Sequence, residues 1–324
     1  MPWIREFQPV YPGGLGEATK CFHLALSLDK KFLDAKAGAI QALREQSSYR
    51  SPDEVWTPIR SSVREVLELD DTHRMARYWL AASQLMYSWE LNEGAAGVLA
   101  SIAPDDSLHR AWLCWTLGQT NQARVEQRRF EKQEIGNPIA RCWLSSAAYL
   151  DRRYEDGIRE AQKSIRLFPN SSLGYLSLAH GAAEAGRYEE ALAAITKGRD
   201  LEDRQEFLAL RGYTYARMGR RDEALEDLRR LEKPSPATAF IEPYHIARVY
   251  MALGDQSAAL TALEKACDQR SDWLVSIEVF GGLRMDPAWK DLQAEPRFQQ
   301  LLKRTGRDKW PRDLPPGYRR EPGI

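Results

Sequence analysis

Apolar residues recur at helical spacing along most of this chain. Leu173, Leu176 and Ala179 share one face of a predicted helix, and Leu192 and Ile195 share one face of the next. Steps of three and four residues are typical of an amphipathic helix, whereas a half-buried strand would alternate apolar and polar positions. No segment shows a convincing alternation of that kind. The pattern therefore predicts an all-α protein.

The predicted helices recur as a repeated unit. The run at 153–158 returns at 187–192 and again at 220–225, so its spacing is nearly constant. Two series of small residues accompany it, and each member of the second follows its partner in the first at the same distance along the chain. Small residues at a fixed offset allow two antiparallel helices to pack closely, so each unit is predicted to be a helical hairpin. The first series is Ser83, Ala111, Ser145, Ala179, Gly212 and Ala247, and the second is Ala95, Ala123, Gly157, Ala191, Ala224 and Ala259.

A glycine marks the turn inside most of these hairpins. Gly118, Gly186, Gly219 and Gly254 lie between the two small positions of their units, and two units lack such a glycine. Glycine suits the left-handed residue that ends many helices.

This pattern resembles the tetratricopeptide repeat, a helix-turn-helix unit of about 34 residues. The match is strongest from Pro138 to Ala266, and Pro169 stands where that family often has proline. The resemblance implies an all-α, right-handed superhelical solenoid of about six to seven antiparallel helix pairs.

Four segments are predicted along the chain: an N-terminal segment at 1–12, a repeat array at 13–270, a helical cap at 271–305 and an extended or disordered tail at 306–324. The array is interrupted near 47–58, where Ser51 and Glu54 have capping-box spacing, Pro52 fits a first helical turn, and Pro58 starts or kinks the next helix. Proline-started short helices are expected within the cap. The mildly basic tail is interpreted as solvated or as folding back on the protein.

The C-terminal third also resembles the repeat regions of bacterial multidomain regulators. The residues that carry this resemblance are 242–247, Leu253–Asp255, Ala259–Leu260, Trp273–Leu274, Asp286–Pro287 and 296–298. In such regulators the repeats follow a winged-helix, kinase or cyclase-like domain, and no such effector domain is evident here. The resemblance implies a regulatory or scaffolding role and no catalytic residue.

Composition and charge limit the classes of binding partner that this protein can have. Hydrophobic residues make up 43% and charged residues 28%, as in soluble globular proteins. Lys and Arg together number 46, as do Asp and Glu, so no net charge attracts nucleic acid or an anionic membrane. No secretion signal and no stretch of roughly 20 apolar residues is present. We therefore expect a cytoplasmic protein with no membrane partner and no nucleic-acid partner.

The inner face of the array is the expected binding surface, because first helices line the concave side of such repeats. Its inward positions are rich in aromatic residues and arginine, which suits contacts with a peptide. An alternative role for Trp112 and Trp115 is packing between repeat units. Arg77, Arg217 and Arg248 could pair with acidic side chains of a partner, but a solvated face is the simpler interpretation of these arginines. The predicted groove residues are Gln84, Trp112, Trp115, Tyr149, His180, Tyr213, Tyr244 and Arg248.

Signatures of catalysis and of metal binding are missing from the sequence. No HExxH, GxSxG or phosphate-loop motif occurs, and the glycine-rich run at 13–16 is interpreted as a linker. The four cysteines have no CxxC spacing and are expected to be buried, reduced thiols. His180 and Glu184 lie four residues apart on one helix face, but a packed or groove-lining histidine is the simpler interpretation. No catalytic residue, cofactor or metal is expected.

The sequence therefore predicts a non-catalytic scaffold that binds a protein or peptide segment in its concave groove. A ligand-sensing regulatory module that acts with a separate effector is the first alternative, and an enzyme built on the repeat scaffold is the second. A small-molecule ligand and the oligomeric state are left open.

Overall fold

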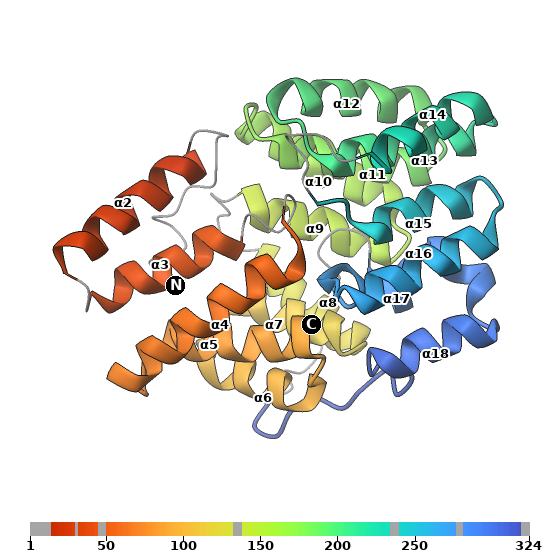
Figure 1. Cartoon of the computed structure of the whole chain (residues 1–324). Coiled ribbons are helices and arrows are strands. Elements are labelled where there is room, and N and C mark those ends of the chain that lie inside the picture. The colour runs from red at the N-terminus through yellow and green to blue at the C-terminus, as the bar shows by residue number, and fades with distance from the viewer. Residues whose placement is uncertain are drawn as a thin grey trace. The chain divides into compact units, whose positions relative to one another are not determined.

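The computed structural model describes residues 14–29, 32–44, 50–131, 138–233, 240–276 and 281–318, and every regular element in these ranges is a helix. The chain divides into two compact units. Unit 1 comprises Met1–Glu134 together with Lys309–Ile324, and unit 2 comprises Ile135–Asp308. The prediction of an all-α protein is confirmed (Figure 1).

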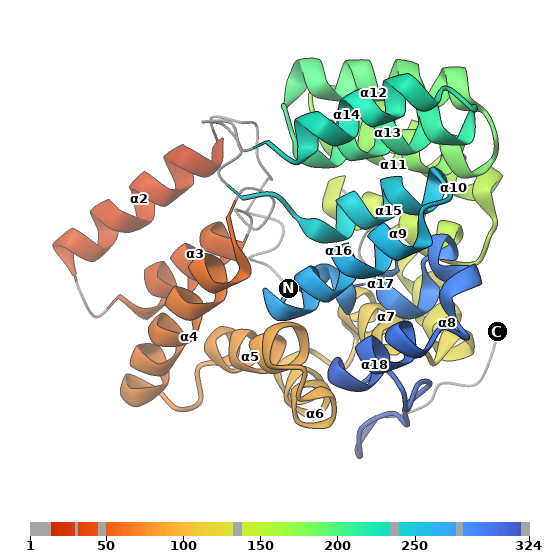
Figure 2. The same ribbon diagram turned by 45° about the vertical axis from the view of Figure 1, so that its right-hand side comes forward.

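Unit 2 is a series of helical hairpins followed by short helices. Each hairpin pairs one helix with the next along the chain, and the first helices also pack against one another in chain order (Figures 1 and 2). The hairpins are α9 (Pro138–Leu150) with α10 (Tyr154–Leu167), α11 (Ser172–Glu184) with α12 (Tyr188–Leu201), α13 (Gln205–Arg217) with α14 (Arg221–Leu231), and α15 (Pro243–Ala252) with α16 (Gln256–Asp268). The short helices are η3 (Asp272–Leu274), α17 (Gly282–Met285), η4 (Pro287–Leu292) and α18 (Pro296–Arg304).

The small-residue positions lie inside these hairpins, as predicted. Ala191 and Ala224 are completely buried. A Cβ atom at Gly157 would come within 3.1 Å of the carbonyl oxygen of Ser145, which is its partner in the other series. The hydroxyl of Ser145 also donates a hydrogen bond of 2.9 Å to the carbonyl oxygen of Gly157. Close backbone approach therefore sets the register of the repeat.

Replacing Ala191 by tryptophan should force α11 and α12 apart. Overpacking of a close contact usually costs about 1–3 kcal/mol of unfolding free energy, and a side chain as large as tryptophan should reach the upper end. Denaturant unfolding measures this loss. Glu189→Trp on the exposed face of the same helix is the control, and equal stability of the two variants would refute the register.

Left-handed residues end the first helix of each hairpin. Gly118, Gly186, Gly219 and Gly254 have φ between +77° and +83°, which confirms the predicted turn glycines. The α9–α10 turn lacks a glycine and instead places Arg152 at φ +58°. A side chain is disfavoured in this region, so the sequence signal is lost there although the turn geometry is kept.

Unit 1 contains shorter and less regular hairpins. The helices α5 with α6 and α7 with α8 pair as hairpins, and α2, α3 and α4 pack in succession before them. The bounds are α2 (Gly14–Leu28), α3 (Leu33–Arg44), α4 (Pro52–Leu69), α5 (Arg74–Ser83), η2 (Gln84–Ser88, one π-helical turn), α6 (Leu91–Ser101), α7 (Ser107–Thr116) and α8 (Thr120–Glu131).

Two expectations for unit 1 are corrected. The capping box of Ser51 and Glu54 and the first-turn Pro52 are confirmed, but Pro58 does not start a new helix, because α4 continues through it. One missing N–H is tolerated there because Trp56 and Ile59 on the same helix are buried. Residues 14–16 of the glycine-rich run form the first turn of α2 rather than a linker, and position 13 lies outside the described residues.

The end of the chain contributes to both units. Pro287 begins η4 and Pro296 begins α18, as predicted, and Trp289 and Phe298 of these helices are fully buried in unit 2. Residues 309–318 follow without further helix and pack on unit 1, so this part of the tail folds back. The last residues, 319–324, lie outside the described part of the chain.

Three cysteines are buried as predicted, Cys114, Cys142 and Cys267, whereas Cys21 on α2 is exposed. No helix among the described residues is long and apolar enough to cross a bilayer.

Candidate functional site

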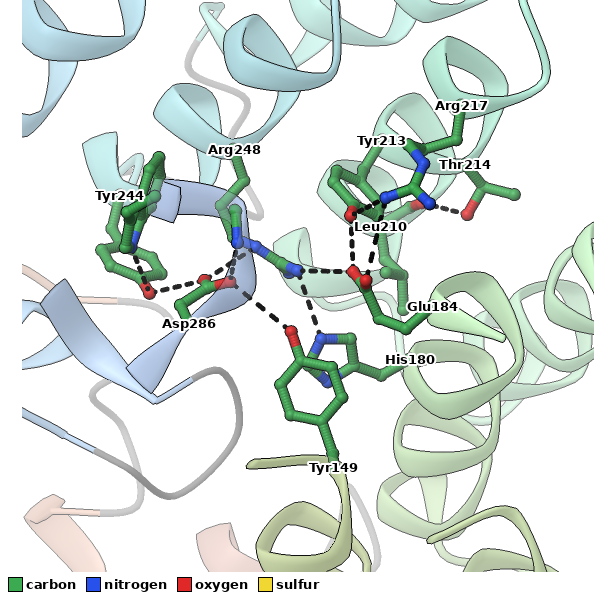
Figure 3. Close-up of polar contacts among 12 residues, drawn as sticks. Tyr149, His180, Glu184, Leu210, Tyr213, Thr214, Arg217, Tyr244, Arg248 and Asp286 are labelled. Carbon is green, nitrogen blue, oxygen red and sulfur yellow. Dashed lines mark hydrogen bonds and ion pairs between the residues drawn. The ribbon is translucent and has the colours of Figure 1, made fainter. Parts of the chain in front are cut away.

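Five of the eight predicted groove residues meet in one polar cluster of unit 2. Tyr149 comes from α9, His180 from α11, Tyr213 from α13, and Tyr244 and Arg248 come from α15 (Figure 3). The side of unit 2 that these helices form together is called the inner face below. The cluster also includes Glu184 of α11 and Asp286, which lies between α17 and η4.

Arg248 and Asp286 form the centre of the cluster. The Nε atom of Arg248 lies 3.0 Å from Oδ2 of Asp286, and the Tyr244 hydroxyl donates to the same oxygen at 2.7 Å. Tyr149 reaches Oδ1 at 3.5 Å. Asp286 is placed by its own helix end, because its side chain caps η4 by accepting from the backbone N–H of Ala288. A carboxylate on residues 281–292 is thus held by the inner face.

A second carboxylate, Glu184, faces the same guanidinium. Its Oε1 atom accepts a hydrogen bond from the Tyr213 hydroxyl and lies 3.5 Å from Nη2 of Arg248. Arg217 adds a second cation, with Nη1 donating to the Tyr213 oxygen at 3.0 Å. The Arg248 guanidinium also stacks over the Tyr213 ring, with 4.7 Å from Cζ to the ring centroid. Two arginines and two carboxylates therefore balance in charge.

His180 takes part as an acceptor. Its Nε2 atom lies 3.2 Å from Nη2 of Arg248, and its ring lies 3.9 Å from the Tyr149 ring between centroids. A guanidinium can only donate, so Nε2 carries the lone pair and the imidazole is neutral with its proton on Nδ1. Glu184 accepts from Tyr213, so the His180–Glu184 spacing on one helix face builds an electrostatic network rather than an acid/base pair.

Burial dominates the electrostatics of this cluster. The side chains of Arg248 and Glu184 are 3% and 4% exposed, and that of Asp286 is 0% exposed. Burial raises the pKa of Asp286 to about 6, although Arg248 and the hydrogen bonds of Ala288 and Tyr244 act in the opposite direction. Burial also raises the pKa of Tyr213, and the neighbouring Glu184 adds to this rise. The interpretation of Arg248 as part of a solvated face is wrong, whereas Arg77 and Arg217 are exposed.

A further buried acid caps the same helix, α15. Glu242 accepts from the backbone N–H of Tyr244 at 3.1 Å, and burial raises its pKa to about 8. The nearby Asp272 and Glu206 raise this pKa further, and the hydrogen bonds of Tyr244 and Ser271 lower it. Burial lowers the pKa of the adjacent His245 to about 4.

The other three predicted residues belong to unit 1. Trp112 and Trp115 are 5% and 3% exposed in α7, and Gln84 begins the π-helical turn after α5 and is partly exposed. Burial of both indoles fits the alternative of packing. Their role in binding stays a prediction.

Sequence reasoning missed Asp286 as part of this site. The sequence marks the Asp286–Pro287 pair as a helix start, which is confirmed, and as part of the resemblance to bacterial regulators, but nothing in its spacing connects it with α15. No group of three or more His, Cys, Asp or Glu side chains that could hold a metal ion occurs among the described residues.

Comparison with known proteins identifies the architecture. The tetratricopeptide-repeat family model matches residues 205–236 and 244–272, which are α13–α14 and α15–α16 with their flanks. The fold is an all-α tetratricopeptide-repeat solenoid. The matched segments cover the hairpins that supply Tyr213, Tyr244 and Arg248, so the cluster is built on recognisable repeats.

Several solved structures are similar to this chain at low sequence identity. A chain of the APC/C hetero-tetramer Cut9-Hcn1 is 16% identical with a TM-score of 0.50, over 91% of this chain and 60% of that one. Yeast Tom70 is 16% identical with a TM-score of 0.45, over 79% of this chain and 55% of that one. YrrB, described as a TPR protein with an unusual peptide-binding site, is 15% identical with a TM-score of 0.30, over 76% of this chain and 100% of that one. This solenoid thus spans somewhat more than half the length of the first two proteins.

At 16% identity and a TM-score of 0.50, the similarity to the Cut9-Hcn1 chain supports the fold alone. A search of curated proteins found no match.

Proposed function

We propose that this protein is a non-catalytic scaffold that binds a segment of another protein on the inner face of unit 2, with a carboxylate of that segment at Arg248. Repeat solenoids provide continuous surface for such contacts. Tyr149, Tyr213, Tyr244 and Arg248 lie on this face, and tyrosine and arginine are among the residue types that contribute most to interface energies once desolvated.

The placement of Asp286 carries the proposal. The inner face already holds a carboxylate on a short chain segment, through the guanidinium of Arg248 and the hydroxyl of Tyr244. A charged hydrogen bond of this kind is stronger than a neutral one and selects for an acidic group. An Asp or Glu side chain of a partner offers the same atoms.

Residues 281–292 control the access of a partner carboxylate to Arg248. They cover Arg248 and Tyr244, which are 3% and 0% exposed. A partner carboxylate therefore competes with Asp286 for Arg248. The partner can bind only to the fraction of molecules in which residues 281–292 have moved away from Arg248. The apparent affinity is therefore lower than the intrinsic affinity by that fraction.

The geometry favours this proposal over the enzyme alternative. General-base catalysis needs an imidazole lone pair that can face a substrate. The Nε2 lone pair of His180 is already directed at Arg248, and His180 is 3% exposed.

Weakening the internal competitor should strengthen partner binding. Asp286→Asn keeps the size of the side chain and removes its charge, so affinity for an acidic partner should rise roughly tenfold, because a larger fraction is competent. Arg248→Lys keeps a charge but loses the planar fork, so affinity should fall roughly tenfold. Calorimetric titration with a partner that copurifies from the native host measures both changes.

Glu189→Gln, on the exposed face of α12, is the matched control and should bind as the wild type does. Equal affinities for Asp286→Asn, Arg248→Lys and Glu189→Gln would contradict a site at Arg248. A copurified metabolite in place of a protein would instead favour the ligand-sensing module.

A further inference from the structure

The C-terminal segment 309–318 lies on unit 1 in the manner of a bound peptide. The backbone N–H of Arg312 donates to the carbonyl oxygen of Leu117 at 2.8 Å, and its own carbonyl oxygen accepts from Nε2 of Gln119 at 2.6 Å. The guanidinium of Arg312 donates to Oδ1 of Asn92 at 2.9 Å. Main-chain hydrogen bonds of this kind fix an extended segment, and side chains beside them supply selectivity.

Tyr318 anchors the far end of this segment. Its ring stacks under the Arg110 guanidinium at 4.1 Å, and its hydroxyl donates to Oε1 of Glu126 at 2.7 Å. The Sγ atom of Cys114 lies 3.2 Å from the same hydroxyl. Arg110 and Glu126 form an ion pair of 3.0 Å with side chains 6% and 0% exposed. Tyr318 therefore packs on the buried ion pair of Arg110 and Glu126, which α7 and α8 form without the C-terminal segment.

Trp310 anchors the near end. Its indole lies so close to the turn between α7 and α8 that a Cβ atom at Gly118 would come within 2.4 Å of the ring. Glycine is thus required at position 118 for two reasons: its φ is +79°, and any side chain there would clash with the Trp310 ring.

Most of the segment rests on the surface, although Pro315 within it is buried. Trp310, Arg312 and Tyr318 remain partly exposed, and Asp313 between them is exposed. Trp289 of residues 281–292, in contrast, is completely buried. Segments that are held mainly by contacts at the surface open at a lower free-energy cost than core elements.

We infer that α6, α7 and α8 carry a linear-peptide site, filled within the chain by residues 309–318, that accepts a partner segment of the same chemistry: an aromatic residue, an arginine two positions later and a tyrosine six positions after that. The tail site, as it is called here, comprises Asn92, Arg110, Cys114, Gly118, Gln119 and Glu126. The C-terminal segment is then its intramolecular competitor. All the residues of this site belong to unit 1, so it does not depend on the inner face of unit 2.

Reactivity of Cys114 reports on the tail site. Cys114 is completely buried, and Tyr318 lies against its sulfur atom. Mass spectrometry after timed alkylation should show fast labelling of the exposed Cys21 and slow labelling of Cys114 in the wild type. In Tyr318→Ala the labelling of Cys114 should be at least about tenfold faster, because the covering segment opens more often.

A synthetic peptide of residues 309–318 tests the recognition itself. Added in excess to Tyr318→Ala, it should return the labelling of Cys114 to the wild-type rate, and the same peptide with alanine in place of tyrosine should not. Asp313→Ala is the matched control within the segment and should label as the wild type does. Circular dichroism confirms that each variant is folded.

Two results would overturn the inference. Slow labelling of Cys114 in Tyr318→Ala would mean that the segment does not cover the site in solution. Fast labelling that the peptide cannot reverse would mean that the segment is held only by its covalent connection and that no peptide site exists. Neither result bears on Arg248, so the proposed function is tested separately.

Discussion

Replacing Arg248 by alanine should lower the free energy of unfolding by about 3–5 kcal/mol, because it leaves a carboxylate buried without its counter-charge. Asp286 has a side chain that is 0% exposed and lies 3.0 Å from Nε of Arg248. The substitution also removes the cation stacked over Tyr213 and exposes Asp286 to the like charge of Glu184. Urea unfolding at neutral pH measures the loss.

The same experiment contains its own diagnostic. Asp286→Asn in the Arg248→Ala background should recover part of the loss, because the uncompensated charge is then gone. Arg297→Ala is the matched control, since Arg297 and Glu264 form an ion pair of 2.7 Å that is 39% and 36% exposed. Such a pair usually contributes no more than about 1 kcal/mol. If Arg248→Ala costs no more than Arg297→Ala, the inner-face cluster does not depend on its charge pairing.

Glu242 should make the protein less stable as the pH rises from about 6.5 to about 8. Burial raises its pKa from 4.5 to about 8, so the native state keeps a proton that the unfolded chain has already lost. Stability falls with pH wherever the native state binds more protons, at about 1.4 kcal/mol per pH unit for one group. The loss over this window should therefore be about 2 kcal/mol.

This window isolates Glu242 from its neighbours. The pKa of His245 is lowered to about 4, so this residue acts in the opposite direction but only between about pH 4 and 6.5. Asp286, with a pKa raised to about 6, acts mainly below the window. Glu242→Gln keeps the hydrogen-bond acceptor for Tyr244 and should flatten the profile above pH 6.5. Glu189→Gln should leave the profile unchanged, and parallel profiles for the wild type and Glu242→Gln would refute the assignment.

These two expectations concern the same helix and bear on function. Arg248 lies on α15 in the inner-face cluster, and Glu242 is the N-cap residue of the same helix. Buried charge is expensive, and well-packed apolar residues would often give equal or greater stability at such positions. Under the proposed function, the charge pair serves selectivity for a carboxylate rather than stability.

The local architecture was predictable from the sequence because backbone sterics impose it. Gly186 and Gly219 stand where φ is positive, and Ala191 and Ala224 stand where two helices touch. Each of these requirements excludes most side chains and therefore leaves a visible pattern at a fixed spacing. Arg152 shows the limit of such reasoning, since the same turn forms there with a residue that carries no signal.

Only the part of the candidate site that lies on the first helices was predictable from the sequence. The repeat register placed Tyr149, His180 and Tyr213 on neighbouring first helices, because the period of the repeat carries the inward positions of each first helix to one face. The register says nothing about what lies over that face. Asp286 lies more than one repeat beyond Arg248 in the chain, and no periodicity connects the two positions.

Sequence by itself determined the helical hairpins, their turns and the side chains that line the inner face, since all of these follow from spacing within a single repeat. Only the tertiary structure decided which of those side chains meet solvent. Residues 281–292 turn a surface stripe into a buried network around Arg248, and residues 309–318 return to α7 and α8. Both placements depend on contacts between distant parts of the chain, and such contacts are selected by shape and charge in three dimensions rather than by any repeating pattern along the sequence.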